Sequence, residues 1–530
     1  MRSQVGLVSL FLGLLLYLLV SVDAQQYEIG SKKKKNIIFM VSDGMGPASL
    51  SLARSFRQYR DNLPYDDILT LDKHLIGSSR TMSSSSLVTD SAAGATAFSC
   101  SLKTYNGAIG IDQFKKPCGT ILEALKLKGY MTGMVVTTRI TDATPASFSS
   151  HAEYRYQEDL IAQQQLGDYP LGRMVDLIIG GGKCHFLPNS IENGCRNDNL
   201  NLIEKALKDG WSIINNKLEF DYLNNGFNAS LPLLALLAPG DIPYDLDRDP
   251  LQYPSLEEQT ITALNALNNS TKNSDKGFFL LVEGSRIDHA GHSNDPAAQV
   301  REVLAYDKAF EAALKFAQNS DDETIIISTS DHETGGLVTA RQISPSYPDY
   351  IWYPQALLNA THSGEFITKK LLDFKNNSGN KDNSQLSAFV QKEILEKDLG
   401  IFDYTAEDID KMIKGSALDV ANNLVSIRSQ TGWTTHGHSA VDVNIYAYGN
   451  SEKLMNSLYR HLGGNHENIE IGKFMEKWLD VDLQKITKLV KDTKFKDLAL
   501  ELEIQDQEPI LVHGPNDEED DEWHENVANY

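Results

Sequence analysis

The sequence predicts an α/β fold: a doubly wound, mostly parallel central sheet with helices on both faces and an inserted helical and loop region. Apolar runs of strand length recur along the chain, and each ends in a turn rich in Asp, Glu, Gly or Thr; they cover residues 36–41, 131–138, 176–182, 277–282 and 324–329. Continuous apolar runs are typical of strands that are buried on both faces. Helical patterns follow most of these runs, which favours right-handed strand–helix–strand units.

The composition indicates a large globular protein and argues against nucleic-acid binding. The chain has 530 residues, of which 41% are hydrophobic and 23% charged, as in globular rather than disordered proteins. The formal net charge is −23, whereas nucleic-acid binders normally present a basic face. A phosphate-binding protein with this charge would need a strong local source of positive potential.

The first residues predict a secretory signal. Residues 1–24 contain one arginine, an apolar run from Val5 to Val20 and a small-residue exit. This pattern predicts a signal peptide cleaved after Ala24, with an uncleaved signal anchor as the alternative. A basic linker follows at residues 25–35.

The rest of the chain divides into one folded domain and a tail. We expect the domain to cover residues 36–500, with an inserted, mostly helical region at about 341–430. The acidic stretch at 505–530 predicts a disordered tail.

Four cysteines and five glycosylation motifs fit the secretory route. We expect the pairs Cys100–Cys118 and Cys184–Cys195, because nearby cysteines meet most easily, although other connectivities or a buried free thiol stay open. The Asn-X-Ser/Thr motifs begin at Asn228, Asn268, Asn269, Asn359 and Asn376.

The first strand and the helix after it are predicted from residues 36–47. The apolar run 36–41 stops at Asp43 and Gly44, and Pro47 suits the first turn of a helix. Asp43 would therefore lie at the carboxyl end of this strand. Taken alone, an Asp at such a place is more often a turn former or a helix cap.

The stretch 88–98 predicts a loop followed by a helix of small residues. Asp90 and Ser91 stand where this helix begins, and both residue types commonly cap helix N-termini. A helix N-terminus also attracts anions, so Ser91 could meet a phosphate there. On this stretch alone, capping is the simpler interpretation.

The strand at 131–138 leads to a second candidate position. Thr144 and Pro145 follow it and could simply start a helix, which we expect to carry His151 and Arg155. Arg155 could bind a phosphate through its planar fork, or it could be one of many surface arginines.

Residue types that bind metals follow the later strands. The candidates are Glu283, Asp288 and His292, then Asp331 and His332, and finally His438. An Asp and a His four residues apart can face the same ion, and a hydrated turn is the alternative for that segment.

These strand ends support one another because the carboxyl ends of strands in a doubly wound sheet form one edge, where ligands bind. Independent turn formers need not recur there with histidines and carboxylates, so we interpret them as a metal site. Mixed carboxylates and imidazoles suit zinc, and an oxygen-only position suits magnesium. Three divalent cations would outweigh the four negative charges of Asp43, Glu283, Asp288 and Asp331.

Six motifs in chain order resemble those of alkaline phosphatases, most of all the fungal vacuolar, repressible type. They are SDGMG at Ser42, VTDSAAGAT at Val88, RITDATPASFSSHAEYR at Arg139, VEGSRIDHAGH at Val282, SDHETGG at Ser330 and TTHGHSAVDVNIYAYG at Thr434. The resemblance covers roughly residues 35–449 and makes the domain at 36–500 a catalytic one.

The resemblance implies metal-dependent hydrolysis of phosphate monoesters through a phosphoserine at Ser91. Arg155 would hold two phosphate oxygens and would itself be steadied by Asp90. Two zinc ions and one magnesium are implied. One zinc would be bound by Asp43, Asp331, His332 and Ser91, the other by Asp288, His292 and His438, and the magnesium by Asp43, Thr144 and Glu283.

The choice of His438 depends on a count. The family histidine directly precedes a strand of the form xxxDVxxYAxG, and counting back from Asp442 gives His438 rather than His436. His362 imitates the mammalian version, but no such strand follows it, so we interpret it as a surface residue.

Two departures from the family pattern leave points open. Asp142 and His289 form a mixed pair where relatives differ, which leaves the third metal unsettled. Only Met1 to Gln4 precede the apolar run, whereas vacuolar relatives carry a basic tail there. We expect the vacuolar lumen or membrane, the cell surface or the medium as the location, with membrane attachment only if the N-terminal segment stays uncleaved.

The expected partners are small phosphate monoesters and, by family resemblance, a second copy of the chain. Two other functions compete. A phosphodiesterase or sulfatase of the same superfamily would usually have threonine or a modified cysteine in place of Ser91 and would lack Arg155. A non-enzymatic metal or phosphate binder would not need the complete set of residues.

Overall fold

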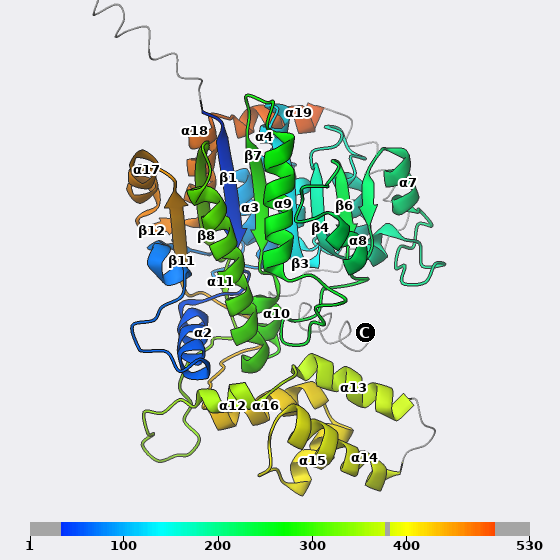
Figure 1. Cartoon of the computed structure of the whole chain (residues 1–530), viewed down its shortest axis with the longest axis vertical. Helices are drawn as coiled ribbons and strands as arrows, with labels where there is room; N and C mark the ends of the chain where they lie inside the picture. Colours follow the sequence, from blue (N-terminus) through cyan, green and yellow to red (C-terminus); the bar gives the residue numbers. More distant parts are fainter. Residues whose placement is uncertain (1–32, 377–381, 493–530) are drawn as a thin grey trace, which may run out of the picture.

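A ten-stranded sheet forms the centre of the protein, shown in Figure 1. The computed structural model describes residues 33–376 and 382–492, so the predicted signal segment and acidic tail lie outside the described residues. The strand order is β12-β2-β11-β8-β1-β7-β3-β4-β6-β5. The strands are β1 (Lys35–Val41), β2 (Leu75–Arg80), β3 (Met131–Arg139), β4 (Leu177–Gly181), β5 (Ser212–Ile214), β6 (Leu233–Leu236), β7 (Phe278–Glu283), β8 (Glu323–Thr329), β11 (Val443–Gly449) and β12 (Gly464–Glu467).

The sheet is mostly parallel, which confirms the predicted fold class. Only β11 runs antiparallel to its two neighbours, β2 and β8. Strand β1 lies between β7 and β8, and Val41 at its end pairs with Glu283 and with Thr329. Three strands therefore end at one level, and the residues that follow them emerge side by side.

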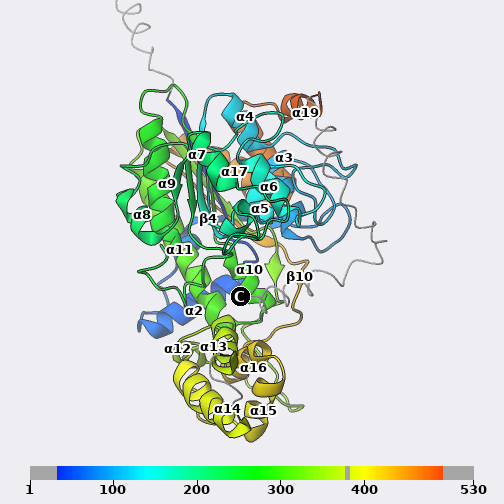
Figure 2. The ribbon, with the colours of Figure 1, turned by 90° about the vertical axis from the view of Figure 1, so that its right-hand side faces the viewer.

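Helices cover both faces because the side chains of each strand alternate between them. In β1, Ile38 and Met40 join one hydrophobic cluster, which contains α2 (Pro47–Arg60), α9 (Leu256–Ser270) and α11 (Pro296–Gln318). Figure 2 shows α9 and the helices α3 to α6 on opposite sides of the sheet.

The opposite face buries Ile37 and Phe39 of β1 in a second cluster. Its helices include α3 (Ser91–Cys100), α4 (Ile121–Leu127) and α18 (Asn468–Leu479). The other helices outside the inserted region are α5 (Ala143–Ser149), α6 (Glu158–Gln165), α7 (Leu202–Lys208), α8 (Lys217–Tyr222), α10 (Arg286–His292), α17 (Glu452–Leu462), α19 (Leu483–Asp492) and the 3₁₀ turns η1 (Leu71–His74) and η2 (Lys183–Phe186).

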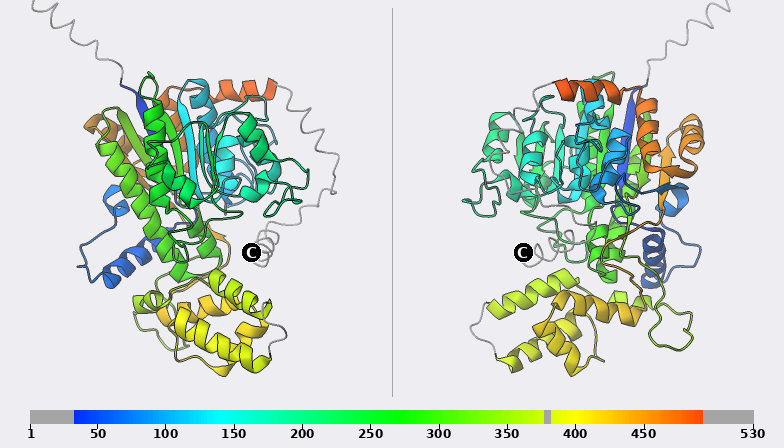
Figure 3. Two further views of the ribbon diagram at one scale, coloured as in Figure 1. Left: turned by 45° about the vertical axis from the view of Figure 1, so that its right-hand side comes forward. Right: turned by 180° about the vertical axis from the view of Figure 1, so that it is seen from behind.

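Residues 354–429 form a helical lobe below the sheet in Figures 1 and 3. Within the part of it that the structure describes, no strand joins the central sheet. The lobe packs through α12 against α2. Its helices are α12 (Pro354–Asn359), α13 (Gly364–Asn376), α14 (Asn383–Phe389), the π-helix η3 (Val390–Asp398), α15 (Ala406–Lys414) and α16 (Ala417–Ser429).

The region 183–276, which contains none of the predicted strands, also contributes to the sheet. It supplies β5 and β6 at one sheet edge and the fifteen-residue helix α9. Strands of three and four residues are too short to show a period of their own. Pairing with a neighbouring strand, β6 with β4 and β5 with β6, defines them instead.

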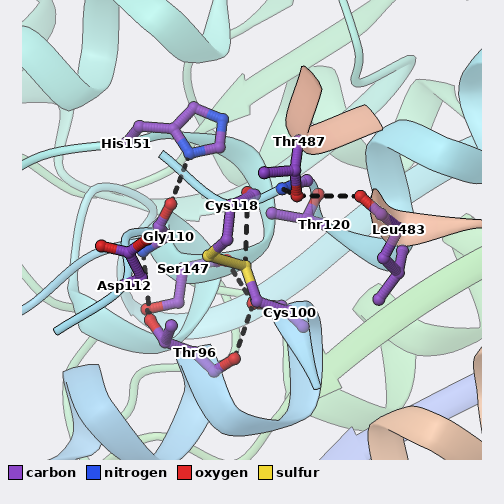
Figure 4. The surroundings of a disulfide bond; sticks show 12 residues. Thr96, Cys100, Gly110, Asp112, Cys118, Thr120, Ser147, His151, Leu483 and Thr487 are labelled. Atoms are coloured by element: carbon purple, nitrogen blue, oxygen red, sulfur yellow. Dashed lines mark hydrogen bonds between the residues drawn. A yellow bond between two sulfur atoms is a disulfide. The ribbon is translucent and has the colours of Figure 1, made fainter. Parts of the chain in front are cut away.

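Both expected disulfides form, Cys100–Cys118 and Cys184–Cys195, with Cα atoms 5.9 and 5.0 Å apart. Figure 4 shows the first, which ties the last residue of α3 to the segment before α4. Helix α3 begins at Ser91, so this bond restrains the far end of the helix that presents it. The two bonds are consistent with an extracellular or secretory location.

No helix among residues 33–376 and 382–492 is long and apolar enough to cross a membrane.

A fully buried ion pair joins Glu123 of α4 to His151. The Glu123 carboxylate accepts from His151 Nε2 at 2.8 Å and from the Tyr169 hydroxyl at 2.6 Å. Burial opposes both charges. The attraction between the two side chains outweighs this effect of burial. The His151 charge lowers the pKa of Glu123, and the Glu123 charge raises the pKa of His151.

We expect Glu123→Gln to lower the free energy of unfolding by about 3 kcal/mol at neutral pH, because it leaves a buried imidazole without its counter-charge. A Glu whose pKa is lowered by folding stabilises the protein at pH values above the pKa of the unfolded chain. A His whose pKa is raised by folding stabilises it at pH values below the pKa of the unfolded chain. The difference between the two proteins should therefore shrink as the pH rises through the raised pKa of His151. Urea unfolding at pH 6, 7.5 and 9 measures it.

Glu258→Gln is the matched control, since Glu258 holds the same capping-box position on α9 as Glu123 does on α4. A glutamine preserves that cap, so this variant should stay near the wild type. Equal losses in the two variants would contradict a special role for the pair with His151.

Candidate active site

Ser91 lies at the first position of α3, where the sequence predicts a helix start. Asp90 caps this helix, and its Oδ1 accepts from the Ala93 amide at 2.9 Å. The other oxygen of Asp90 accepts from the Gly107 amide at 2.8 Å. Ser91 is only 2% exposed, so its hydroxyl faces the interior of the site.

Glycines let the surrounding elements approach one another closely. A Cβ on Gly94 of α3 would lie 2.9 Å from Asp331 Cβ, and one on Gly44 would lie 2.5 Å from Asp288 Cα. Gly44 also has a φ of +76°, which L residues rarely adopt. These close approaches bring the turns after β1, β7 and β8 into one group.

The first group of candidate ligands consists of Asp43, Asp331 and His332. One ligand atom from each lies within 4.8 Å of the others. His332 Nε2 is 3.6 Å from Asp43 Oδ1 and 3.4 Å from Asp331 Oδ2. The same nitrogen lies 3.1 Å from Ser91 Oγ, so the hydroxyl borders this group.

The second group joins α10 to the short strand β10 (His438–Ser439), which pairs with β9 (Glu333–Thr334). Asp288 and His292 lie one turn apart on α10, with Oδ2 and Nε2 separated by 3.3 Å. His438 Nε2 is 3.1 Å from His292 Nε2 and 3.6 Å from Asp288 Oδ1. The ring of His438 also stacks on that of His332, so the two groups adjoin.

The hydrogen bonds of the two histidines orient their Nε2 atoms. His438 Nδ1 contacts the Thr89 carbonyl, and His292 Nδ1 contacts the His436 carbonyl. A carbonyl only accepts, so both Nδ1 atoms carry the hydrogen. In the neutral rings both Nε2 atoms then present lone pairs to each other across 3.1 Å, with the Asp288 carboxylate beside them. These lone pairs and the carboxylate repel one another unless a metal ion or a proton lies between them.

The oxygen ligands predicted for magnesium lie beside Asp43. Glu283 ends β7, and its Oε2 accepts from the Ser285 hydroxyl at 2.6 Å. Burial, with Asp142 and Asp331 nearby, raises the pKa of Glu283 to about 8. Burial and then Asp288 raise the pKa of Asp331 to about 6. Burial and four neighbouring carboxylates raise the pKa of Asp43 well above its usual range.

Two buried carboxylate oxygens of the site, Asp43 Oδ1 and Asp331 Oδ2, have no hydrogen-bond partner among the described residues. Buried polar atoms are normally satisfied. The site thus combines unsatisfied oxygens, imidazole lone pairs that face each other, and carboxylates with raised pKa values. Together these features fit a site that binds divalent cations.

Arg155 faces the site from a turn, because α5 ends at Ser149, and the prediction that this helix carries His151 and Arg155 is wrong. The hydroxyls of Ser149 and Ser150 donate to the backbone carbonyls four residues earlier in the chain. Arg155 Nη2 donates to Asp142 Oδ1 at 3.0 Å, and its Nη1 lies 3.6 Å from Asp90 Oδ2.

Asp142 has a larger role in the structure than its sequence pattern indicates. It caps α5, so Thr144 lies inside that helix rather than at its start. Thr144 and Asp142 are both candidate caps by residue type, and only the backbone shows which one serves. The shorter contact of Arg155 is with Asp142 rather than with the expected Asp90.

The competing histidines are not members of the two groups, although His436 contacts the backbone of His292. His436 is exposed, and its Nδ1 contacts the His292 carbonyl. His362 is half-buried rather than fully at the surface, because it stacks on Phe366 within the helical lobe. His289 lies 3.3 Å from Asp241.

A sequence model described as alkaline phosphatase matches residues 34–481. The chain belongs to the alkaline phosphatase family. It is 58% identical over 501 residues to the repressible alkaline phosphatase of Saccharomyces cerevisiae, a match that covers 91% of this chain and 88% of that protein.

Solved alkaline phosphatases share the fold. The cold-active enzyme from the psychrophile Shewanella sp. is 30% identical, with a TM-score of 0.69 over 84% of this chain and 99% of that one. A mutant of the TAB5 alkaline phosphatase, described with Mg bound in its M3 site, is 27% identical, with a TM-score of 0.57 over 85% and 99% of the two chains. Family and fold together support an enzyme that hydrolyses phosphate monoesters and uses divalent metal ions.

Proposed function

We propose that this alkaline phosphatase hydrolyses phosphate monoesters through a phosphoserine at Ser91. The observation that supports this most directly is the position of its hydroxyl. Ser91 lies at the N-terminus of α3, 3.1 Å from His332 Nε2 and beside the cluster of candidate ligands. A helix N-terminus favours the phosphate dianion.

The residues present fit three divalent cations, for which we propose two zinc ions and one magnesium. When bound, the cations would lower the pKa of the Ser91 hydroxyl and offset the charge of the phosphoryl oxygens. The proposed ligands are Asp43, Asp331, His332 and Ser91 for one zinc, Asp288, His292 and His438 for the other, and Asp43, Thr144 and Glu283 for the magnesium.

The residues of the chain then have distinct tasks. Ser91 Oγ gives its proton to solvent water and attacks phosphorus as the bond to the leaving alcohol breaks; the leaving oxygen takes one proton back from the solvent, so that no net proton is gained or lost. Arg155 holds two phosphoryl oxygens through its planar fork, and Asp90 and Asp142 fix its approach. Water then cleaves the phosphoserine, which restores the hydroxyl and releases inorganic phosphate.

We expect p-nitrophenyl phosphate to be hydrolysed with a kcat/KM at least about 100-fold above that of bis-p-nitrophenyl phosphate. A monoester has three free phosphoryl oxygens, so two can contact Arg155 while the third faces the candidate metal ligands; a diester has only two free oxygens and one negative charge, and its second ester group would occupy one of these positions. Steady-state kinetics with both esters measure the ratio. Faster turnover of the diester would assign the protein to the phosphodiesterases instead.

The location and assembly are proposed on the same family basis. We propose that the protein enters the secretory pathway, resides in the vacuole or at the cell surface and forms a homodimer. Asn228, Asn359 and Asn376 are exposed and are the proposed glycosylation sites; Asn268 and Asn269 are half-buried. Enzymatic deglycosylation followed by mass measurement tests this part.

A further inference from the structure

Arg139, the last residue of β3, lies at the centre of a cluster of charges behind Arg155. Its Nε donates to Glu158 at 3.0 and 3.1 Å, and its Nη1 donates to Asp241 Oδ1 at 3.0 Å. Its Nη2 donates to Asp142 Oδ2 at 3.2 Å. Three carboxylates thus use three different nitrogens of one guanidinium group.

Asp142 connects this cluster to the site. While Oδ2 accepts from Arg139, Oδ1 accepts from Arg155 Nη2 at 3.0 Å and from the Ala143 amide at 2.7 Å. Each oxygen of the carboxylate is therefore held by a different arginine. The orientation that Asp142 offers to Arg155 depends on Arg139 because the two contacts share one rigid group.

Asp241 holds Arg139 in turn. Its Oδ1 accepts from both the backbone amide and the side chain of Arg139, at 2.9 and 3.0 Å. Burial alone would raise the pKa of Asp241, but Arg139 and His289 hold it well below its usual range. The residue comes from the loop between β6 and α9, so this loop contributes to the arrangement from outside the site.

We infer that Arg139 is a positioning residue for phosphate binding, which acts through Asp142 on Arg155 and is itself fixed by Asp241. The inference rests on the proposed function. Without Arg139, the Asp142 carboxylate is free to turn both oxygens onto Arg155, which would neutralise the guanidinium group and hold it back from the phosphate. Arg139 touches no reacting atom, so its loss should weaken binding more than the chemical step.

The test measures the binding of inorganic phosphate to the metal-loaded protein by calorimetry, together with kcat and KM for p-nitrophenyl phosphate. We expect Arg139→Met to weaken phosphate binding about tenfold and to raise KM similarly, with kcat changed less than about threefold. Asp241→Asn should act in the same direction with a smaller effect. Arg139→Lys should recover part of the loss, because it restores the charge without the three-way fork.

A double-mutant cycle separates positioning from stability. In an Arg155→Ala protein, adding Arg139→Met should change phosphate affinity less than about twofold, since the group it positions is gone. An equal loss in both backgrounds, or wild-type affinity in Arg139→Met, would overturn the inference.

Arg54→Met is the matched control. Arg54 of α2 makes a fork to Asp72 with comparable exposure, and its replacement should leave phosphate affinity unchanged. A wild-type protein that binds phosphate without turning over the ester would count against the proposed function alone.

Discussion

Ser91→Ala should lower kcat for p-nitrophenyl phosphate by about 10⁴-fold or more, because it removes the hydroxyl that contacts His332 Nε2, whereas the neighbouring Thr334 hydroxyl contacts the opposite ring nitrogen, Nδ1. Alanine is compatible with the first turn of α3, and the Asp90 cap uses the Ala93 amide rather than the serine. Thermal unfolding should therefore change little while turnover is lost. Steady-state kinetics and a melting curve on the same preparation measure the two effects.

Ser99→Ala is the control variant for Ser91→Ala, because both serines belong to α3. Ser99 is also buried, but its hydroxyl donates to the Ser147 carbonyl at 2.6 Å, away from the site. It should keep nearly full activity. Rapid quenching of the wild type with a radiolabelled substrate should trap the phosphate on Ser91, and a Ser91→Ala protein that retained activity would remove Ser91 from the proposed mechanism.

Removal of the metals should abolish activity and also lower the melting temperature. A ligand present at about 1,000 times its dissociation constant stabilises a folded protein by about 4 kcal/mol. Dialysis against EDTA should remove this contribution, and zinc with magnesium should restore both activity and stability. A metal-free protein with unchanged activity and melting temperature would contradict the metal assignment.

The metal-free protein should have an unusual pH dependence. Glu283 and Asp331 have raised pKa values, about 8 and about 6, and the pKa of Asp43 is also raised. An acid whose folded pKa is raised binds more protons when folded, so stability falls as the pH rises from about 4 through the folded pKa. The metal-free protein should therefore melt at a higher temperature at pH 5 than at pH 8.5.

Asp43→Asn separates repulsion from ligation. In the metal-free protein it removes one charge from a crowded group and should raise the melting temperature by about 2 °C at pH 8.5. In the metal-loaded protein it removes a ligand and should lower both stability and activity. Asp72 forms an ion pair with Arg54 outside the site. The change in melting temperature caused by Asp72→Asn should therefore have the same sign in the metal-free and the metal-loaded protein.

Much of the fold follows from local patterns. The apolar runs that became β1, β3, β7 and β8 are continuous because these strands are buried on both faces. Two short strands, Ser212–Ile214 and Leu233–Leu236, were missed, since they are strands only by virtue of the neighbours that they pair with.

Parts of the site could be located from the sequence for the same reason. Asp43, Glu283 and Asp331 end or follow neighbouring strands, and parallel pairing brings those ends to one level. Arg155 is different. Its turn follows the end of α5 at Ser149, and it lies nearer to Asp142 than to Asp90, although the sequence pattern relates Asp142 to a metal rather than to an arginine.

The sequence by itself determined the fold class, the family and the set of polar residues at the strand ends, because each depends on residue types at short spacing; it favoured the two disulfides, whose pairing the structure confirmed. Only the tertiary structure decided how these residues face one another: the two Nε2 lone pairs of His292 and His438 across 3.1 Å, and Arg139 behind Asp142. The physical reason is that hydrophobic patterning acts over a few residues, whereas the orientation of a buried charge depends on partners brought in from distant strands and loops.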